Sequence, residues 1–173
     1  AFIETLEAQR PTRPAVTDRL AASRRTAIVE ASETVSPAVV SITVTSTRQA
    51  QAQTPFDFFF VPQSPREQQG FGTGFIIREH GVILTNQHVV SGADRIIVTL
   101  PDGSDVQAQL LGEDALTDIA VIKVDRTGLR TAKTGKSTDL MIGEWVVALG
   151  NPFAYLLGNV EPTVTAGVIS AVN

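Results

Sequence analysis

The chain of 173 residues contains no cysteine. A disulfide framework, a thiolate metal site and a thiol nucleophile are therefore excluded. Histidine is scarce too, and His80 and His88 lack the further ligands that a zinc site needs. No stretch approaches the roughly 20 apolar residues of a membrane-spanning helix. We expect no metal site and no membrane span in this chain.

Basic clusters are equally scarce. Arg24 and Arg25 form the only adjacent basic pair, and the formal net charge is -4 with a pI near 5.1. Nucleic-acid-binding proteins usually carry a clustered basic surface, so no nucleic-acid partner is expected. The hydrophobic content of 43% is ample for the core of one domain.

The first residues do not resemble a signal peptide. They lack a charged start followed by an apolar run. The chain begins at Ala1 rather than at a methionine, which indicates processing or trimming of a longer polypeptide.

A helix is expected near the N-terminus. Apolar side chains recur at helical spacing over residues 17–34. Thr17, followed by Asp18, supplies an N-cap. The helix should end near Val35, because the residue before Pro37 is pushed out of the α region. Its predicted role is to pack or to tether.

Beyond Pro37 the sequence changes to short β-branched runs separated by turn residues, about every 8 to 12 residues. This pattern predicts an antiparallel barrel or sandwich, and the lack of intervening helical patterns counts against a parallel sheet. The expected strands cover residues 38–45, 74–78, 82–86, 95–100, 106–111 and 119–124.

Two more strands are expected after a polar interval at residues 125–139. They cover residues 145–149 and 164–172. Two strands cannot close a barrel, and an unfinished sheet with apolar faces favours association.

Two residues at predicted strand ends point to acid–base chemistry. His88 follows the strand 82–86, and Asp118 opens the strand 119–124. Histidine has an ordinary pKa of about 6.5, which suits a general base near neutral pH. A buried carboxylate on the other ring nitrogen would hold its tautomer. The alternative is that both are hydrogen-bonded structural residues. His80, in a turn, is expected to be solvated.

Five segments resemble, in the same order, those of the HtrA (Deg) family of trypsin-like serine proteases. They are residues 71–77, 81–90, 117–123, 142–153 and 163–170. The resemblance implies that His88 is the general base and that Asp118 fixes its tautomer. It implies no metal and no organic cofactor.

The resemblance also implies the fold. The chain should be an all-β, trypsin-like N-terminal portion with an N-terminal helix. Residues 1–35 would form the lead and helix. Residues 36–125 would form a six-stranded antiparallel barrel, with a long loop at 46–70. Residues 126–173 would form a linker and the first strands of an incomplete second barrel.

No nucleophilic serine is recognisable. Ser91, Ser104, Ser137 and Ser170 lack the Gly-x-Ser-Gly context that supplies a sharp turn and oxyanion donors. Loss of the nucleophile from a catalytic triad costs on the order of 10⁶ in rate. We therefore expect this chain alone to be inactive.

Two loops are candidate functional segments. By the resemblance, the segment 46–70 is the long first loop, and its Phe58, Phe59 and Phe60 would contact another subunit or substrate. A local hydrophobic tuck is the alternative. Residues 153–161 would be a regulatory loop, or else a plain turn. Its candidate residues are Phe153, Tyr155, Leu156 and Leu157.

The resemblance implies a serine endopeptidase of protein quality control and the stress response, located in the periplasm or cell envelope. It would cleave misfolded polypeptides. A homo-oligomer, a trimer by resemblance, or pairing with a missing second-barrel fragment is expected. The alternative is a non-catalytic β-barrel module for binding or oligomerisation; a proteolytic product of a full enzyme is a further possibility.

Overall fold

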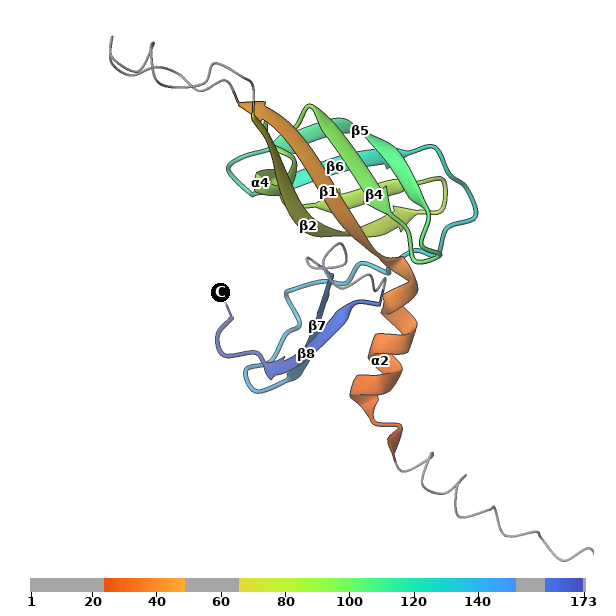
Figure 1. Cartoon of the computed structure of the whole chain (residues 1–173). Helices are drawn as coiled ribbons and strands as arrows, with labels where there is room; N and C mark the ends of the chain where they lie inside the picture. The colour runs from red at the N-terminus through yellow and green to blue at the C-terminus, as the bar shows by residue number, and fades with distance from the viewer. Residues whose placement is uncertain (1–23, 49–65, 152–160, 173) are drawn as a thin grey trace, which may run out of the picture.

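The computed structural model describes residues 24–48, 66–151 and 161–172. A short helix leads into a closed barrel, and a separate two-stranded sheet lies below the barrel beside that helix (Figure 1). None of the helices in these ranges is long and apolar enough to cross a membrane.

Helix α2 (Ala27–Val35) is shorter than the sequence predicts. Thr26 has an extended backbone, and its hydroxyl accepts a hydrogen bond from the Val29 N–H. A residue that caps a helix cannot also lie inside it, so the expectation of one continuous helix through Thr26 is wrong. The expected cap Thr17 lies outside the described residues. The predicted end at Val35 is confirmed, and the 3₁₀ turn η1 (Ser36–Ala38) follows.

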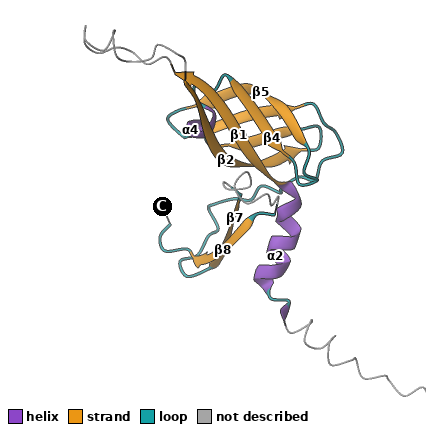
Figure 2. Ribbon diagram, viewed as in Figure 1, coloured by secondary structure: helices purple, strands orange, loops and turns teal. Residues whose placement is uncertain are grey.

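Six antiparallel strands close the barrel in the order β1-β2-β3-β6-β5-β4. Strand β1 lies between β2 and β4 and pairs with both (Figure 2). This confirms the predicted six-stranded antiparallel barrel. The strands are β1 (Val39–Arg48), β2 (Arg66–Arg78), β3 (Val82–Thr85), β4 (Arg95–Thr99), β5 (Asp105–Asp114) and β6 (Ile119–Val124).

The first two strands extend beyond the body of the barrel as a ribbon. Ser46 pairs with Gln68, and Arg48 pairs with Arg66. The prediction of a loop over residues 46–70 is therefore wrong at both ends, because continuing the antiparallel ladder satisfies backbone groups that a loop would leave to water. The intervening residues 49–65, which include Phe58, Phe59 and Phe60, lie outside the described residues.

The barrel core is built from β-branched side chains that alternate along the strands. Ile42, Ile76, Ile83, Val98 and Ile122 are almost completely buried. Burying one such side chain contributes about 1.5–3 kcal/mol relative to leaving it exposed. This core makes the barrel a rigid support for its rim.

Strands β7 (Trp145–Gly150) and β8 (Thr163–Val168) form the second, two-stranded sheet. The sequence predicts β8 as far as residue 172, but the strand ends at Val168 because Val168 pairs with Trp145, the first residue of β7. Beyond that pair Ile169 bonds the turn before β7: its N–H donates to the Glu144 carbonyl at 2.9 Å, and its carbonyl accepts from the Gly143 N–H at 2.8 Å.

Asn151, next to β7, joins this sheet to the barrel. Its N–H donates to Thr73 Oγ1 at 2.9 Å, and its carbonyl accepts from Ser41 Oγ at 3.1 Å. Asn151 is buried, with 5% exposure. Two barrel hydroxyls thus hold the main chain where β7 ends.

Candidate active site

The barrel topology brings His88 and Asp118 together at one rim. Strand β3 leads into the short helix α4 (Gln87–Val90), which contains His88, and Asp118 immediately precedes β6. Strands β3 and β6 are antiparallel neighbours, with Thr85 opposite Ala120. The end of one strand therefore lies beside the start of the other. The helix was not foreseen, because four residues are too few for a helical periodicity to be visible.

The two side chains make a close hydrogen bond. His88 Nδ1 lies 2.8 Å from Asp118 Oδ2 and 3.0 Å from Oδ1. A carboxylate only accepts hydrogen bonds, so the proton of this pair is on Nδ1. The other ring nitrogen, Nε2, is left to accept a proton from a partner. This is the tautomer that a general base of the serine protease type requires.

The main chain supports the same contact. The backbone N–H of His88 donates to Asp118 Oδ1 at 3.0 Å, and that of Gln87 donates to the Asp118 carbonyl at 3.1 Å. Asp118 has φ of 55°, the only positive φ of a non-glycine residue in the described part of the chain. Such a conformation is uncommon outside glycine and persists where surrounding contacts hold it.

Asn86 is a third residue of the site, which reasoning from the sequence missed. Its Nδ2 donates to Asp118 Oδ2 at 3.1 Å and to the Asp118 carbonyl at 3.3 Å. In the sequence, Asn86 is only the last residue of the predicted strand 82–86, two residues before the histidine, and that position does not indicate this contact.

These hydrogen bonds set the electrostatics of the carboxylate. The His88 backbone N–H holds the pKa of Asp118 below its ordinary value, with smaller contributions from the His88 ring and the Asn86 amide; burial opposes the shift. Asp118 is therefore ionised at neutral pH and can stabilise a positive charge on the imidazole.

Glycine at position 72 lets α4 pack closely on β2. A Cβ at Gly72 would lie 2.5 Å from Val89 Cγ1 and 2.7 Å from Cγ2. These distances are shorter than any van der Waals contact between carbon atoms. The backbone of β2 thus sets how near the helix of His88 lies to the barrel.

The pair is open to solvent in the described residues. The side chain of His88 is 70% exposed and that of Asp118 is 42% exposed. Asp118 lies on the rim of the barrel, and no described element covers it.

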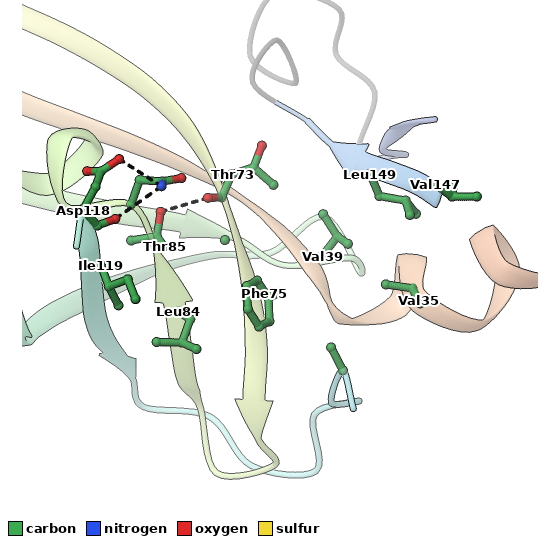
Figure 3. A pocket seen from close by; sticks show the side chains of 13 residues that line it. Val35, Val39, Thr73, Phe75, Leu84, Thr85, Asp118, Ile119, Val147 and Leu149 are labelled. Carbon is green, nitrogen blue, oxygen red and sulfur yellow. Dashed lines mark hydrogen bonds between the residues drawn. The ribbon is translucent and has the colours of Figure 1, made fainter. Parts of the chain in front are cut away.

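Two hollows adjoin the pair. A cavity of about 550 Å³ lies between the rim and β7, with Asp118 at one end and the apolar side chains of Leu149 and Val35 at the other (Figure 3). A smaller hollow of about 220 Å³ borders His88 on the side of the β1–β2 ribbon, where Ser46 and Gln69 supply polar groups.

One of the remaining candidate residues, His80, lies in the described part of the chain. His80 is exposed in the turn before β3, as predicted. Phe153, Tyr155, Leu156 and Leu157 lie outside the described residues. Across the described ranges, no three His, Asp or Glu side chains come together to hold a metal ion.

Comparison with known proteins identifies relatives of this chain. The family model of the trypsin-like peptidase domain matches residues 72–173, more than half of the chain. A "Probable periplasmic serine endoprotease DegP-like" of Ectopseudomonas mendocina is 44% identical over 165 residues, covering 80% of this chain and 33% of the relative. A protein of the same description from Halomonas elongata is 50% identical over 107 residues, covering 62% of this chain and 22% of the relative.

Solved structures that resemble this chain also belong to HtrA-type proteases. A variant of the HtrA-type protease AlgW with a decapeptide gives a TM-score of 0.73 at 34% identity, covering 84% of this chain and 45% of that one. AlgW itself with a decapeptide gives 0.65 at 35% identity, covering 84% of this chain and 46% of that one. The chain spans about a third of the length of the first DegP-like relative. It belongs to the trypsin-like peptidase family, in the lineage of the HtrA and DegP-like serine endopeptidases.

Proposed function

We propose that this chain supplies the general base and its orienting carboxylate to a periplasmic serine endopeptidase of the HtrA type. The observation that supports this most directly is the 2.8 Å contact between His88 Nδ1 and Asp118 Oδ2. It fixes the tautomer in which Nε2 is free to take a proton.

In the proposed reaction, a serine hydroxyl from outside these residues approaches His88 Nε2. Nε2 takes the hydroxyl proton as the serine oxygen attacks a peptide carbonyl, and Asp118 stabilises the imidazolium that forms. The imidazolium then returns the proton to the leaving amine, which leaves an acyl-enzyme. Water, activated by the same base, hydrolyses the acyl-enzyme and releases the serine.

The substrates, assembly and location belong to the same proposal. The substrates are misfolded polypeptides, and the enzyme is a homo-oligomer, a trimer by the family resemblance. The names of the DegP-like relatives support a periplasmic location. In the proposed enzyme, the side chains of Phe58, Phe59 and Phe60 contact another subunit or the substrate. The loop that contains Phe153, Tyr155, Leu156 and Leu157 regulates the active site.

A chimera tests the proposed function. Residues 1–173 would replace the matching part of the DegP-like protein of Ectopseudomonas mendocina, which would provide the missing serine. We expect hydrolysis of an unfolded casein, and a loss of about 10⁶-fold in kcat for His88→Ala in the same chimera. A folded chimera that retains its activity after His88→Ala would refute the assignment of the base.

The chain by itself provides the complementary prediction. We expect no hydrolysis of casein and no labelling by a fluorophosphonate probe, because none of its serines has the context of an activated nucleophile. Labelling of any serine in the isolated chain, located by mass spectrometry, would contradict this.

A further inference from the structure

The start of helix α4 has an unusual cap. Asn86 occupies the N-cap position with φ of -79° and ψ of 146°. An asparagine there normally turns its side-chain oxygen to a free N–H of the first helical turn. Asn86 makes no such bond. The N–H of His88, the second helical residue, instead donates to Asp118 Oδ1. A carboxylate next to β6 therefore caps the helix in place of the asparagine.

Because Asp118 supplies the cap, the side chain of Asn86 need not turn its oxygen toward the helix and can point its amide group at Asp118 instead. Its Nδ2 donates to both Asp118 Oδ2 and the Asp118 carbonyl, at 3.1 and 3.3 Å. One amide thus bridges the side chain and the main chain of the same residue. That residue has a positive φ, a conformation that needs such support.

The bridge restricts how the carboxylate can turn. Oδ1 accepts from the His88 backbone, and Oδ2 accepts from both Asn86 Nδ2 and the His88 ring. His88 Nδ1 also lies 3.0 Å from Oδ1, so in the described part of the chain the Asn86 amide is the one donor to the carboxylate oxygens that does not come from His88. Without the amide, Oδ2 would be held by the imidazole alone, at a rim where the Asp118 side chain is 42% exposed to competing water.

We propose that Asn86 is a positioning residue, which locks the Asp118 carboxylate in the orientation that keeps the proton of His88 on Nδ1. Its importance for catalysis rests on the proposed function, whereas its effect on the imidazole tautomer does not. The competing explanation is that Asn86 serves only to begin a helix.

Three variants of the 173-residue chain separate these explanations. Asn86→Asp keeps the shape of the side chain and removes its donor, and Asn86→Ser removes the amide. Asp and Ser are both good N-cap residues, so α4 can still begin at the same place. The matched control is Gln87→Ala, which removes an amide from the same helix that bonds Glu113 rather than Asp118.

The measurement is ¹⁵N NMR of the histidine ring nitrogens at a pH where the ring is neutral, combined with ¹³C NMR titration of the Asp118 carboxyl. In both Asn86 variants we expect the Nδ1 signal to move toward that of an unprotonated nitrogen. We expect the Asp118 carboxyl to titrate at higher pH, with the larger shift in Asn86→Asp because the new carboxylate repels the old one. Gln87→Ala should resemble the parent chain in both measurements.

Unchanged Nδ1 signals and an unchanged Asp118 titration in both folded Asn86 variants would overturn the proposal. Amide spectra that retain the barrel pattern establish that the variants are folded. If Asn86→Asp disrupts the barrel rim, Asn86→Ser still tests whether Asn86 positions the Asp118 carboxylate, because this variant introduces no charge.

The DegP-like chimera tests the catalytic consequence. Asn86→Ser should lower kcat by about 10- to 100-fold and leave KM nearly unchanged, because the misplaced base acts only in the chemical step. A chimera without any activity would refute the proposed function and leave the NMR result intact. An active chimera with unchanged kcat in Asn86→Ser would overturn the catalytic part of the inference.

Discussion

At the scale of single residues, Asp118 does three things at once. It caps α4, bonds the imidazole of His88 and holds a left-handed backbone conformation. An aspartate is suited to this, because its short side chain can bond local backbone groups and tolerates a positive φ better than most residues do. The backbone N–H of His88 and the Asp118 side chain therefore hold the His88–Asp118 contact at the barrel rim, where no element of the described residues covers it.

Acid should destabilise the chain through its hydrogen-bonded aspartates. Backbone N–H groups hold the pKa values of Asp94 and Asp118 below the ordinary 3.8, and the Ser104 and Thr117 hydroxyls do the same for Asp102 and Asp114. A pKa that is lower in the folded state adds stability above the unfolded value. That stability is lost as the pH falls through the folded pKa.

We expect the urea midpoint to be nearly constant above about pH 5 and to fall progressively below about pH 4. Asp94→Asn should weaken this dependence, because it removes the carboxylate that accepts the Thr47 N–H. A midpoint that rises on acidification would contradict the sign of these shifts.

At the scale of elements, the sequence predicted the existence of the strands better than the residues at which they begin and end. The β-branched run that became β6 was placed at its observed bounds, because its alternating pattern is strong. Strand β5 extends three residues beyond its predicted end, into Gly112, Glu113 and Asp114, because pairing with β6 overrides their low strand propensity.

The candidate site, too, could be predicted only in part from the sequence. His88 and Asp118 were identifiable from their segments, and the structure places them in hydrogen-bonding contact. Asn86 was not identifiable, because its contact depends on Asp118 having taken over the cap of a helix too short to predict. Contacts that depend on which strand lies beside which cannot be deduced from local pattern.

The packing of α4 on β2 predicts a steric effect on the site. Gly72→Ala places a methyl group against the stiff side chain of Val89, so the helix of His88 must shift. We expect a loss of about 1–3 kcal/mol in unfolding free energy and a weakened His88–Asp118 contact by ¹⁵N NMR.

Two further variants test whether the close approach of Gly72 to Val89 causes this effect. Val89→Ala combined with Gly72→Ala should recover the parent ring-nitrogen signals, because the added methyl then has room. Gly112→Ala serves as the control, since a Cβ at Gly112 meets nothing within 4 Å. Equal effects of Gly72→Ala and Gly112→Ala would show that the close approach is unimportant.

At the scale of the whole molecule, the barrel and the second sheet are joined through buried polar groups of Asn151. The donor and acceptor on this residue are satisfied by Thr73 and Ser41, residues of two different barrel strands. Buried polar groups lose free energy when a partner is removed, so this contact couples the two parts.

Thr73→Val should loosen that coupling. The Asn151 N–H loses its acceptor at the barrel while the size of the side chain is retained, at a cost of about 1–3 kcal/mol. We expect faster hydrogen exchange of the β7 amides, with β4 and β5 protected as in the parent chain. Ser41→Ala should act in the same direction more weakly, and uniform exchange across both sheets would contradict a local coupling.

The cap of α4 also has a consequence for the order of events during folding. A helix of four residues is not stable in isolation, and the group that caps this one arrives only when β6 has paired with β3. In a partly folded chain, in which β1 to β3 have formed but β6 has not, His88 therefore has no fixed direction. A newly made polypeptide would acquire an aligned base only once this part of its barrel is assembled, so folding itself would set when the His88–Asp118 pair forms.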